Sequence, residues 1–292
     1  MLRAIVLAMA LLPCWSAVWA QEKAKEEKTE QKKPSTPAEQ FAALQGEYQK
    51  AQSEFFLAYQ KATTDEERQA VVAEKSPDRG KYASRILELA EKNAEDPVAF
   101  EALLWIVSNV RTGDQPARAV EIFTKDHIEN EKLSQVCARL IYSPSPASEL
   151  LLRAALEKSP HEQVRGTACY SLAKYLKQQL RLVEYFKSQP EIAPQIEVFY
   201  GKELGTRLQS LDPEKINQEI EDLLAQTIES YAEVEVYGRT LGDLAKGELF
   251  EIRHLSVGKV APEIEGEDID GVAFNLGDYR GKVVVLDFWG NW

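Results

Sequence analysis

Serine-proline and aspartate-proline pairs recur along the middle of this chain and mark the places where helices are expected to begin. A Ser or Asp side chain accepts a hydrogen bond from a free amide at a helix start, and a following Pro has no amide to leave unpaired. The pairs are Ser76–Pro77, Asp96–Pro97, Ser145–Pro146, Ser159–Pro160 and Asp212–Pro213. Ser159 and Glu162 also have the spacing of a reciprocal capping box. A succession of short helices is therefore predicted.

The spacing of apolar residues between these pairs also predicts helices, because apolar side chains three and four positions apart gather on one helical face. Such faces are formed by Leu133, Val136, Cys137, Leu140 and Ile141, and by Val98, Ala102, Leu103, Ile106, Val107 and Val110. Segments starting at Phe100, Cys137 and Cys169 each place an apolar residue three positions before a Leu, at intervals typical of helix-hairpin repeats. We predict a mainly α fold in which residues 41–256 form an α-helical repeat-like (solenoid) domain.

The first 20 residues have the pattern of a secretory signal peptide. Arg3 precedes an apolar run, and small or aliphatic residues stand at Val18 and Ala20. An uncleaved membrane anchor is the alternative, but Pro13 interrupts the run, and a spanning helix needs about 20 apolar residues. Cys14 suggests lipoprotein processing, although a preceding proline disfavours it. We expect cleavage and a secreted or periplasmic protein, with no integral membrane span afterwards.

Residues 21–40 mix lysines and glutamates without a hydrophobic period, and this composition predicts a charged, disordered tether. A docking tail for a partner protein is the alternative interpretation. The net charge of −12 disfavours nucleic-acid binding, which requires clustered Lys and Arg side chains.

Two cysteines follow the signal peptide, Cys137 and Cys169. They cannot form a disulfide framework for a domain of this size, so packing must hold the helices together. Their shared repeat position permits one disulfide between stacked helices. The alternative is two buried free thiols, which the usual separation of packed helix axes, about 8 to 10 Å, favours.

The three histidines, His127, His161 and His254, lie far apart in the sequence and have no Cys or carboxylate at the spacing of metal ligands. The segment HIENE at His127 comes nearest to a ligand cluster, and we expect it to be a solvated helix face. No metal site is predicted from these residues.

The residue pattern changes at Val257, after which short runs of β-forming residues are separated by the turn-forming residues Pro, Gly and Asp. Asp270 and Gly271 predict a tight turn before a short strand at residues 272–274. Residues 283–288 are apolar at consecutive positions, a pattern typical of a central strand covered on both faces. A second domain is therefore predicted over residues 257–292.

The segments VGKVAP, DIDG, FNLGDYRGK and VVVLDFWGNW together resemble the opening of a redoxin or AhpC/TSA-type thioredoxin-like domain, of the extracytoplasmic thiol-disulfide oxidoreductase branch. The resemblance implies an incomplete α/β thioredoxin-like domain after the helices. In that family Cys-x-x-Cys directly follows the strand, so we expect the chain to be truncated just before that motif and inactive in this form. A peroxiredoxin is the alternative, but FWGNW favours the Cys-x-x-Cys branch.

The same resemblance suggests roles for three residues. Asp287 matches a carboxylate that relays a proton to or from the second thiol, and Trp289 and Trp292 match the aromatic side chains beside the nucleophile. An ordinary polar residue at a strand end is the alternative for Asp287. The resemblance also implies protein or small-molecule thiols and disulfides as partners, with no metal and no bound organic cofactor.

A different function remains open. The helical domain, with an acidic surface, is also compatible with a non-enzymatic extracytoplasmic binding or scaffold protein, because helical repeats commonly bind extended partners.

Overall fold

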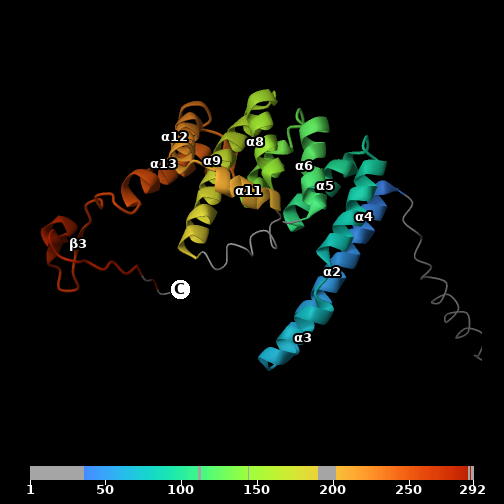
Figure 1. The fold of residues 1–292 in the computed structure, drawn as a ribbon, viewed down its shortest axis with the longest axis horizontal. Helices are drawn as coiled ribbons and strands as arrows, with labels where there is room; N and C mark the ends of the chain where they lie inside the picture. Colours follow the sequence, from blue (N-terminus) through green and yellow to red (C-terminus); the bar gives the residue numbers. More distant parts are fainter. Residues whose placement is uncertain (1–35, 111–112, 144, 190–201, 289, 291–292) are drawn as a thin grey trace, which may run out of the picture. The chain divides into compact units, whose positions relative to one another are not determined.

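The computed structural model describes residues 36–110, 113–143, 145–189, 202–288 and 290, and most of them are helical (Figure 1). This confirms the mainly α prediction. The predicted signal peptide and residues 21–35 of the predicted tether lie outside the described residues. The chain divides into two compact units, residues 1–75 and 76–292. None of the helices in the described ranges has both the length and the apolar character needed to cross a membrane.

The first unit contains α2 (Pro37–Lys61) and α3 (Asp65–Lys75). The start of α2 is a capping box that the sequence analysis missed. The Thr36 hydroxyl accepts a hydrogen bond from the Glu39 amide at 3.2 Å, and the Glu39 carboxylate accepts one from the Thr36 amide at 3.1 Å. Because these bonds and Pro37 begin a helix, residues 37–40 belong to α2 rather than to the predicted tether.

The second unit consists mainly of helices, and short strands lie in its last part (Figure 1). Its helices are α4 (Arg79–Lys92), α5 (Pro97–Asn109), α6 (Asp114–Asp126), α7 (Leu133–Leu140), α8 (Pro146–Lys158), α9 (Glu162–Ser188), α11 (Lys202–Ser210), α12 (Pro213–Ser230) and α13 (Leu241–Phe250). The strands β1 (Glu235–Val236) and β2 (Arg239–Thr240) form a small hairpin before α13. A π-helical turn, Glu251–Leu255, extends α13.

Three of the five predicted helix starts are confirmed. The Asp96 carboxylate accepts a hydrogen bond from the Val98 amide at 2.9 Å, and Asp212 likewise caps α12. Ser145 precedes α8 as predicted, although its hydroxyl makes no capping bond to the helix.

The other two starts are wrong. Asp78, not Ser76, caps α4, because its carboxylate accepts a hydrogen bond from the Lys81 amide at 3.1 Å. Ser159 ends α8 instead of beginning α9, and its hydroxyl accepts from the His161 amide at 3.4 Å. The capping box predicted between Ser159 and Glu162 is therefore not formed.

The long helix α9 forms the centre of the core in the second unit. It packs against α7, α8 and α12, and α8, α9 and α12 lie side by side (Figure 1). Its buried apolar side chains include Val164, Ala168, Cys169, Leu172, Tyr175 and Leu176. The predicted face of α7 is buried as expected from Leu133 to Leu140, whereas Ile141 follows the helix and is half-buried.

The helix α13 is joined to α9 by a cluster of charged side chains. Glu248 accepts hydrogen bonds from Lys174 and, at 2.8 Å, from Lys177. Glu251 pairs with Lys177 at 3.0 Å and with Arg181 at 3.3 Å. Burial acts to raise the pKa of Glu248, but the hydrogen bonds and charges of the two lysines outweigh it and hold that pKa below its usual value.

Gly166 lets the chain after α12 approach α9 closely, and replacing it should destabilise the protein. A Cβ atom at residue 166 would lie 3.0 Å from Cβ of Tyr231 and 3.2 Å from a methyl group of Val234. We expect Gly166→Val to lower the free energy of unfolding by about 1–3 kcal/mol through overpacking, measured by urea denaturation. Gly46→Ala in α2 is the control, because that position is open, and it should leave stability unchanged or raised. Equal effects of the two substitutions would contradict this account.

The last part of the second unit contains a β-hairpin formed by β3 (Glu265–Glu267) and β4 (Ala273–Asn275), which pair in antiparallel register. The Asp268 carboxylate accepts hydrogen bonds from the amides of Asp270 and Val272, both at 2.9 Å. Gly271 has φ +78°, a conformation that favours glycine. The predicted turn and the short strand after it are therefore confirmed, with β4 one residue later than expected.

The predicted central strand at residues 283–288 is wrong for this structure. These residues have no regular secondary structure, and the side chains of Val285 and Phe288 are 87% and 85% exposed. A consecutively apolar run becomes a strand only when neighbours satisfy its backbone and cover both faces. Among the described residues the nearby strands β3 and β4 pair with each other, and no strand pairs with the run.

Candidate functional site

The structure describes one of the three residues predicted from the family resemblance. Asp287 lies in the exposed run after the hairpin, and no hydrogen bond or ion pair is shown for its carboxylate within the described residues. Trp289 and Trp292 lie outside the described residues. The three predicted side chains are therefore not brought together as a site by the part of the chain that is described.

The hairpin segment is held together by contacts between the residues that directly follow VGKVAP and the motif FNLGDYRGK. The Glu263 carboxylate accepts a hydrogen bond from the Gly277 amide at 2.5 Å, and the Ile264 carbonyl accepts one from the Leu276 amide at 2.9 Å. A Cβ atom at residue 277 would lie 2.7 Å from that carboxylate. The segment that follows VGKVAP thus lies against the glycine of FNLG, and a side chain at residue 277 would displace the Glu263 carboxylate.

Cys137 and Cys169 are free and buried, as the packing argument predicted, so the disulfide alternative is wrong for this structure. The Cys169 thiol donates a hydrogen bond to the Leu223 carbonyl at 3.3 Å. Burial raises the pKa of Cys137 to about 12 and that of Cys169 to about 11. A thiol acts as a nucleophile only as the thiolate, so both groups have the character of core side chains rather than redox centres.

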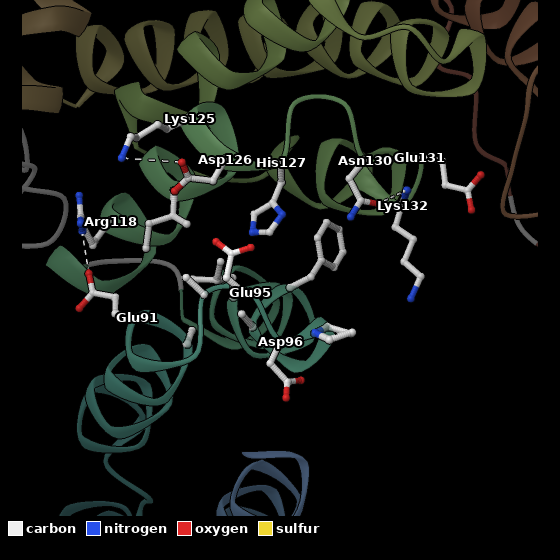
Figure 2. Close-up of a pocket in the computed structure, with 17 residues that line it drawn as sticks. Glu91, Glu95, Asp96, Arg118, Lys125, Asp126, His127, Asn130, Glu131 and Lys132 are labelled. Carbon is white, nitrogen blue, oxygen red and sulfur yellow. Dashed lines mark hydrogen bonds and ion pairs between the residues drawn. The ribbon is translucent and has the colours of Figure 1, made fainter. Parts of the chain in front are cut away.

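A cavity of about 1020 Å³ lies among α4, α5, α6 and the loop before α7. Its apolar lining consists of Ala90, Ala94, Pro97, Ala99, Phe100, Leu103 and Ile122. Charged and polar side chains form its rim, and Figure 2 shows the His127 ring and the Glu95 carboxylate both directed into the open space. The cavity therefore combines apolar side chains with a polar, mostly acidic rim.

His127 is placed by the end of α6, where it is the C-cap residue and its amide donates to the Phe123 carbonyl at 3.1 Å. Its ring lies edge-on to Phe100, with ring centroids 5.4 Å apart, and 5.7 Å from Phe123. Burial lowers the pKa of His127 and outweighs the opposing charge of Asp126. The ring is therefore neutral at pH 7 and offers one acceptor and one donor nitrogen.

The positive side chains of the rim are already paired with carboxylates. Arg118 bonds Glu91 at 2.9 Å, Lys125 lies 3.7 Å from Asp126, and Lys132 bonds Glu101 at 3.0 Å. The first two pairs are drawn in Figure 2.

Two rim carboxylates, those of Glu95 and Glu131, have no hydrogen-bond or ion-pair partner shown among the described residues. Because the cations are compensated, the uncompensated charge of the rim is negative.

The sequence analysis missed this cavity because it treated HIENE as a solvated helix face. The sequence feature that could have indicated the cavity is the spacing of Phe123 and His127, which places both rings on one face of α6. A third ring, that of Phe100, comes from the preceding helix. The structure instead gives His127 a half-buried position in an aromatic cluster. In the part of the chain that the structure describes, no three His, Cys, Asp or Glu side chains gather closely enough to hold a metal ion.

Comparison with known proteins found a short similarity to a thiol-disulfide oxidoreductase. The curated relative is thiol-disulfide oxidoreductase ResA of Geobacillus thermodenitrificans (strain NG80-2), which is 47% identical over 38 residues. The similar stretch is 13% of this chain and 22% of the relative, so the chain spans about a fifth of that relative's length. No family model matches the chain, and no solved structure matches it. The similarity links one stretch of this chain to the thiol-disulfide oxidoreductases.

Proposed function

We propose that residues 257–292 belong to a thioredoxin-like domain of the redoxin, AhpC/TSA type and that the protein takes part in thiol-disulfide exchange outside the cytoplasm. The observation that carries this proposal is the 47% identity with a thiol-disulfide oxidoreductase over 38 residues. We infer that this similar stretch covers residues 257–292, where the four motifs that carry the resemblance lie. The order of the four motifs and the hairpin contact between Glu263 and Gly277 support the same assignment.

In thiol-disulfide exchange a thiolate attacks one sulfur of a disulfide, the S–S bond breaks, and a mixed disulfide forms that a second thiol resolves. Residues 257–292 contain no cysteine, and Cys137 and Cys169 are buried thiols with raised pKa values. Residues 21–292 therefore contribute no accessible thiolate. In the proposed domain, Asp287 would relay a proton, and Trp289 and Trp292 would flank the reacting sulfur.

The first test is an insulin-reduction assay on residues 21–292 with dithiothreitol as the electron donor. We expect no turnover above dithiothreitol alone, since no exposed low-pKa thiol is present among residues 21–292. Turnover that is lost in the Cys137→Ala or Cys169→Ala variant would place the reacting sulfur in the helical core and contradict this assignment.

The second test asks whether residues 257–292 have the proposed fold. These residues replace the stretch of the Geobacillus relative that they resemble, and the chimera is compared with the unaltered relative. We expect one cooperative unfolding transition and a rate of exchange with dithiothreitol within about tenfold of the relative.

A second chimera carrying Val285→Asp is the control. It should fail to fold, because the proposed strand is covered on both faces and a buried unpaired carboxylate is costly. If the unsubstituted chimera is unfolded under conditions where the relative is folded, the thioredoxin-like assignment is wrong.

Export is part of the proposal and rests on the pattern of residues 1–20. N-terminal sequencing of protein recovered outside the cytoplasm should begin near Gln21, whereas an intact Met1 in that fraction would contradict cleavage.

A second candidate function is a non-enzymatic binding or scaffold role for the helices. We propose that residues 41–256 form a repeat-like array, and the cavity beside His127 favours a binding role. In the first proposal this array recruits partners to the oxidoreductase domain. In the second it is the whole function, and the chimera test separates the two.

A further inference from the structure

The cavity beside His127 has no part in the proposed thiol chemistry, which belongs to residues 257–292. We propose that this cavity is a recognition site for an arginine or lysine side chain carried by an extended segment of a partner protein. The residues that form it lie between Ala90 and Lys132.

The charge of the rim selects a cation. Arg118, Lys125 and Lys132 are each within 4 Å of a carboxylate oxygen, so their charges are compensated. Glu95 and Glu131 remain without such a partner among the residues described; the Glu95 carboxylate points into the cavity, whereas that of Glu131 points away from it (Figure 2). A basic side chain in the cavity would gain a charge-assisted hydrogen bond to Glu95 that an acidic or neutral side chain could not, and Glu131 adds to the negative charge at the edge of the rim.

The lining of the cavity matches the rest of an arginine or lysine side chain. Both residues have an apolar stem that packs on apolar surface while the charged end stays among polar groups. Ala94 and Pro97, which are exposed, supply such a surface beside the rim. The His127 ring adds an aromatic edge and, because burial keeps it neutral, an acceptor nitrogen for an N–H donor.

The size of the cavity favours a segment of chain over a free amino acid. Its volume of about 1020 Å³ is at the upper end of the range of about 300–1,000 Å³ that is typical of sites for small ligands. One basic side chain would leave most of that space to the residues on either side of it. The net charge of −12 would also speed the approach of a basic partner.

The test measures binding of three short peptides to the protein by NMR of the histidine rings. The probe is an acetylated and amidated nonapeptide with leucine-arginine-leucine at its centre, and the matched peptides carry citrulline or glutamate instead of arginine. We expect the arginine peptide to shift the ring signals of His127 in a saturable manner. His161 and His254 lie outside the cavity and serve as internal references.

Two charge-matched double variants identify the residues responsible. Glu95→Gln with Glu131→Gln removes the two uncompensated carboxylates, and Glu74→Gln with Glu157→Gln makes the same charge change at exposed positions outside the cavity. We expect the first pair to weaken binding of the arginine peptide by at least about tenfold and the second pair to weaken it by less than about threefold.

Several results would overturn the proposal. One is that the His127 signals do not shift at about 1 mM peptide, roughly the weakest affinity of interest. The others are that the citrulline or glutamate peptide binds as tightly as the arginine peptide, or that the two double variants lose the same amount of affinity. Because none of these residues lies in residues 257–292, such a failure would leave the proposed thiol chemistry untouched, and failure of the chimera would leave this site untouched.

Discussion

We expect Cys137 to react with an aromatic disulfide reagent about a thousandfold more slowly in the folded protein than in the unfolded chain, and Cys169 about a hundredfold more slowly. The reagent reacts with the thiolate, and burial raises the two pKa values from an ordinary 9.0 to about 12 and about 11. At pH 8 the unfolded thiols are partly ionised, whereas the folded ones are almost wholly protonated. Steric burial slows the reaction further.

The measurement uses protein that begins at Gln21, so that Cys137 and Cys169 are its only thiols. The release of chromophore is followed at pH 8 with and without urea at about 8 M, which unfolds a small domain. The single variants Cys137→Ala and Cys169→Ala assign each rate to one residue. A native rate within about tenfold of the unfolded rate would reveal a reactive thiol in the helical core and contradict the assignment of redox chemistry to residues 257–292.

The second large effect is expected at Tyr175, which fills the core between α9 and the start of α8. Its side chain is fully buried, and its hydroxyl donates a hydrogen bond to the Ser145 carbonyl at 3.2 Å. We expect Tyr175→Ala to lower the free energy of unfolding by about 3–5 kcal/mol, because a large cavity replaces the ring. Tyr175→Phe keeps the ring and should cost only about 1 kcal/mol for the lost hydrogen bond.

Urea denaturation of both variants checks these values, and Tyr185→Ala on the same helix is the control. Tyr185 is 48% exposed, so its loss should change stability by less than about 1 kcal/mol. If Tyr175→Ala and Tyr185→Ala lower the free energy of unfolding by the same amount, the packing of Tyr175 does not stabilise the core as described.

The sequence predicted the helical class well because its signals are local. Asp96 and Asp212 cap the helices that their spacing to Pro indicated, and the apolar face of α7 is buried. The wrong starts have a physical cause, because several side chains near a helix end compete for the same amides. Asp78 lies closer to the first turn of α4 than Ser76 does, and the preceding helix extends to Ser159.

Features that depend on distant partners were harder to predict. The run at residues 283–288 has strand propensity, but pairing needs neighbours, and the described residues provide none. The cavity beside His127 depends on Phe100 from another helix and on which rim cations are already paired, and neither appears in the linear sequence. The roles predicted for Asp287 and the two tryptophans depend on the family resemblance alone, because these roles require atoms that a complete fold brings together.

The charged cluster between α13 and α9 has a mechanical consequence. The helix α13 is the last one before the hairpin segment, and Glu248 ties it to two lysines of the helix at the centre of the core. A force applied to the hairpin segment would therefore pass directly to α9, the helix at the centre of the core, through side chains that are largely shielded from solvent. The outer pair of Arg181 and Glu251 is more exposed. Added salt should therefore weaken this pair first, while the less exposed pairs of Glu248 with the two lysines still connect α13 to α9.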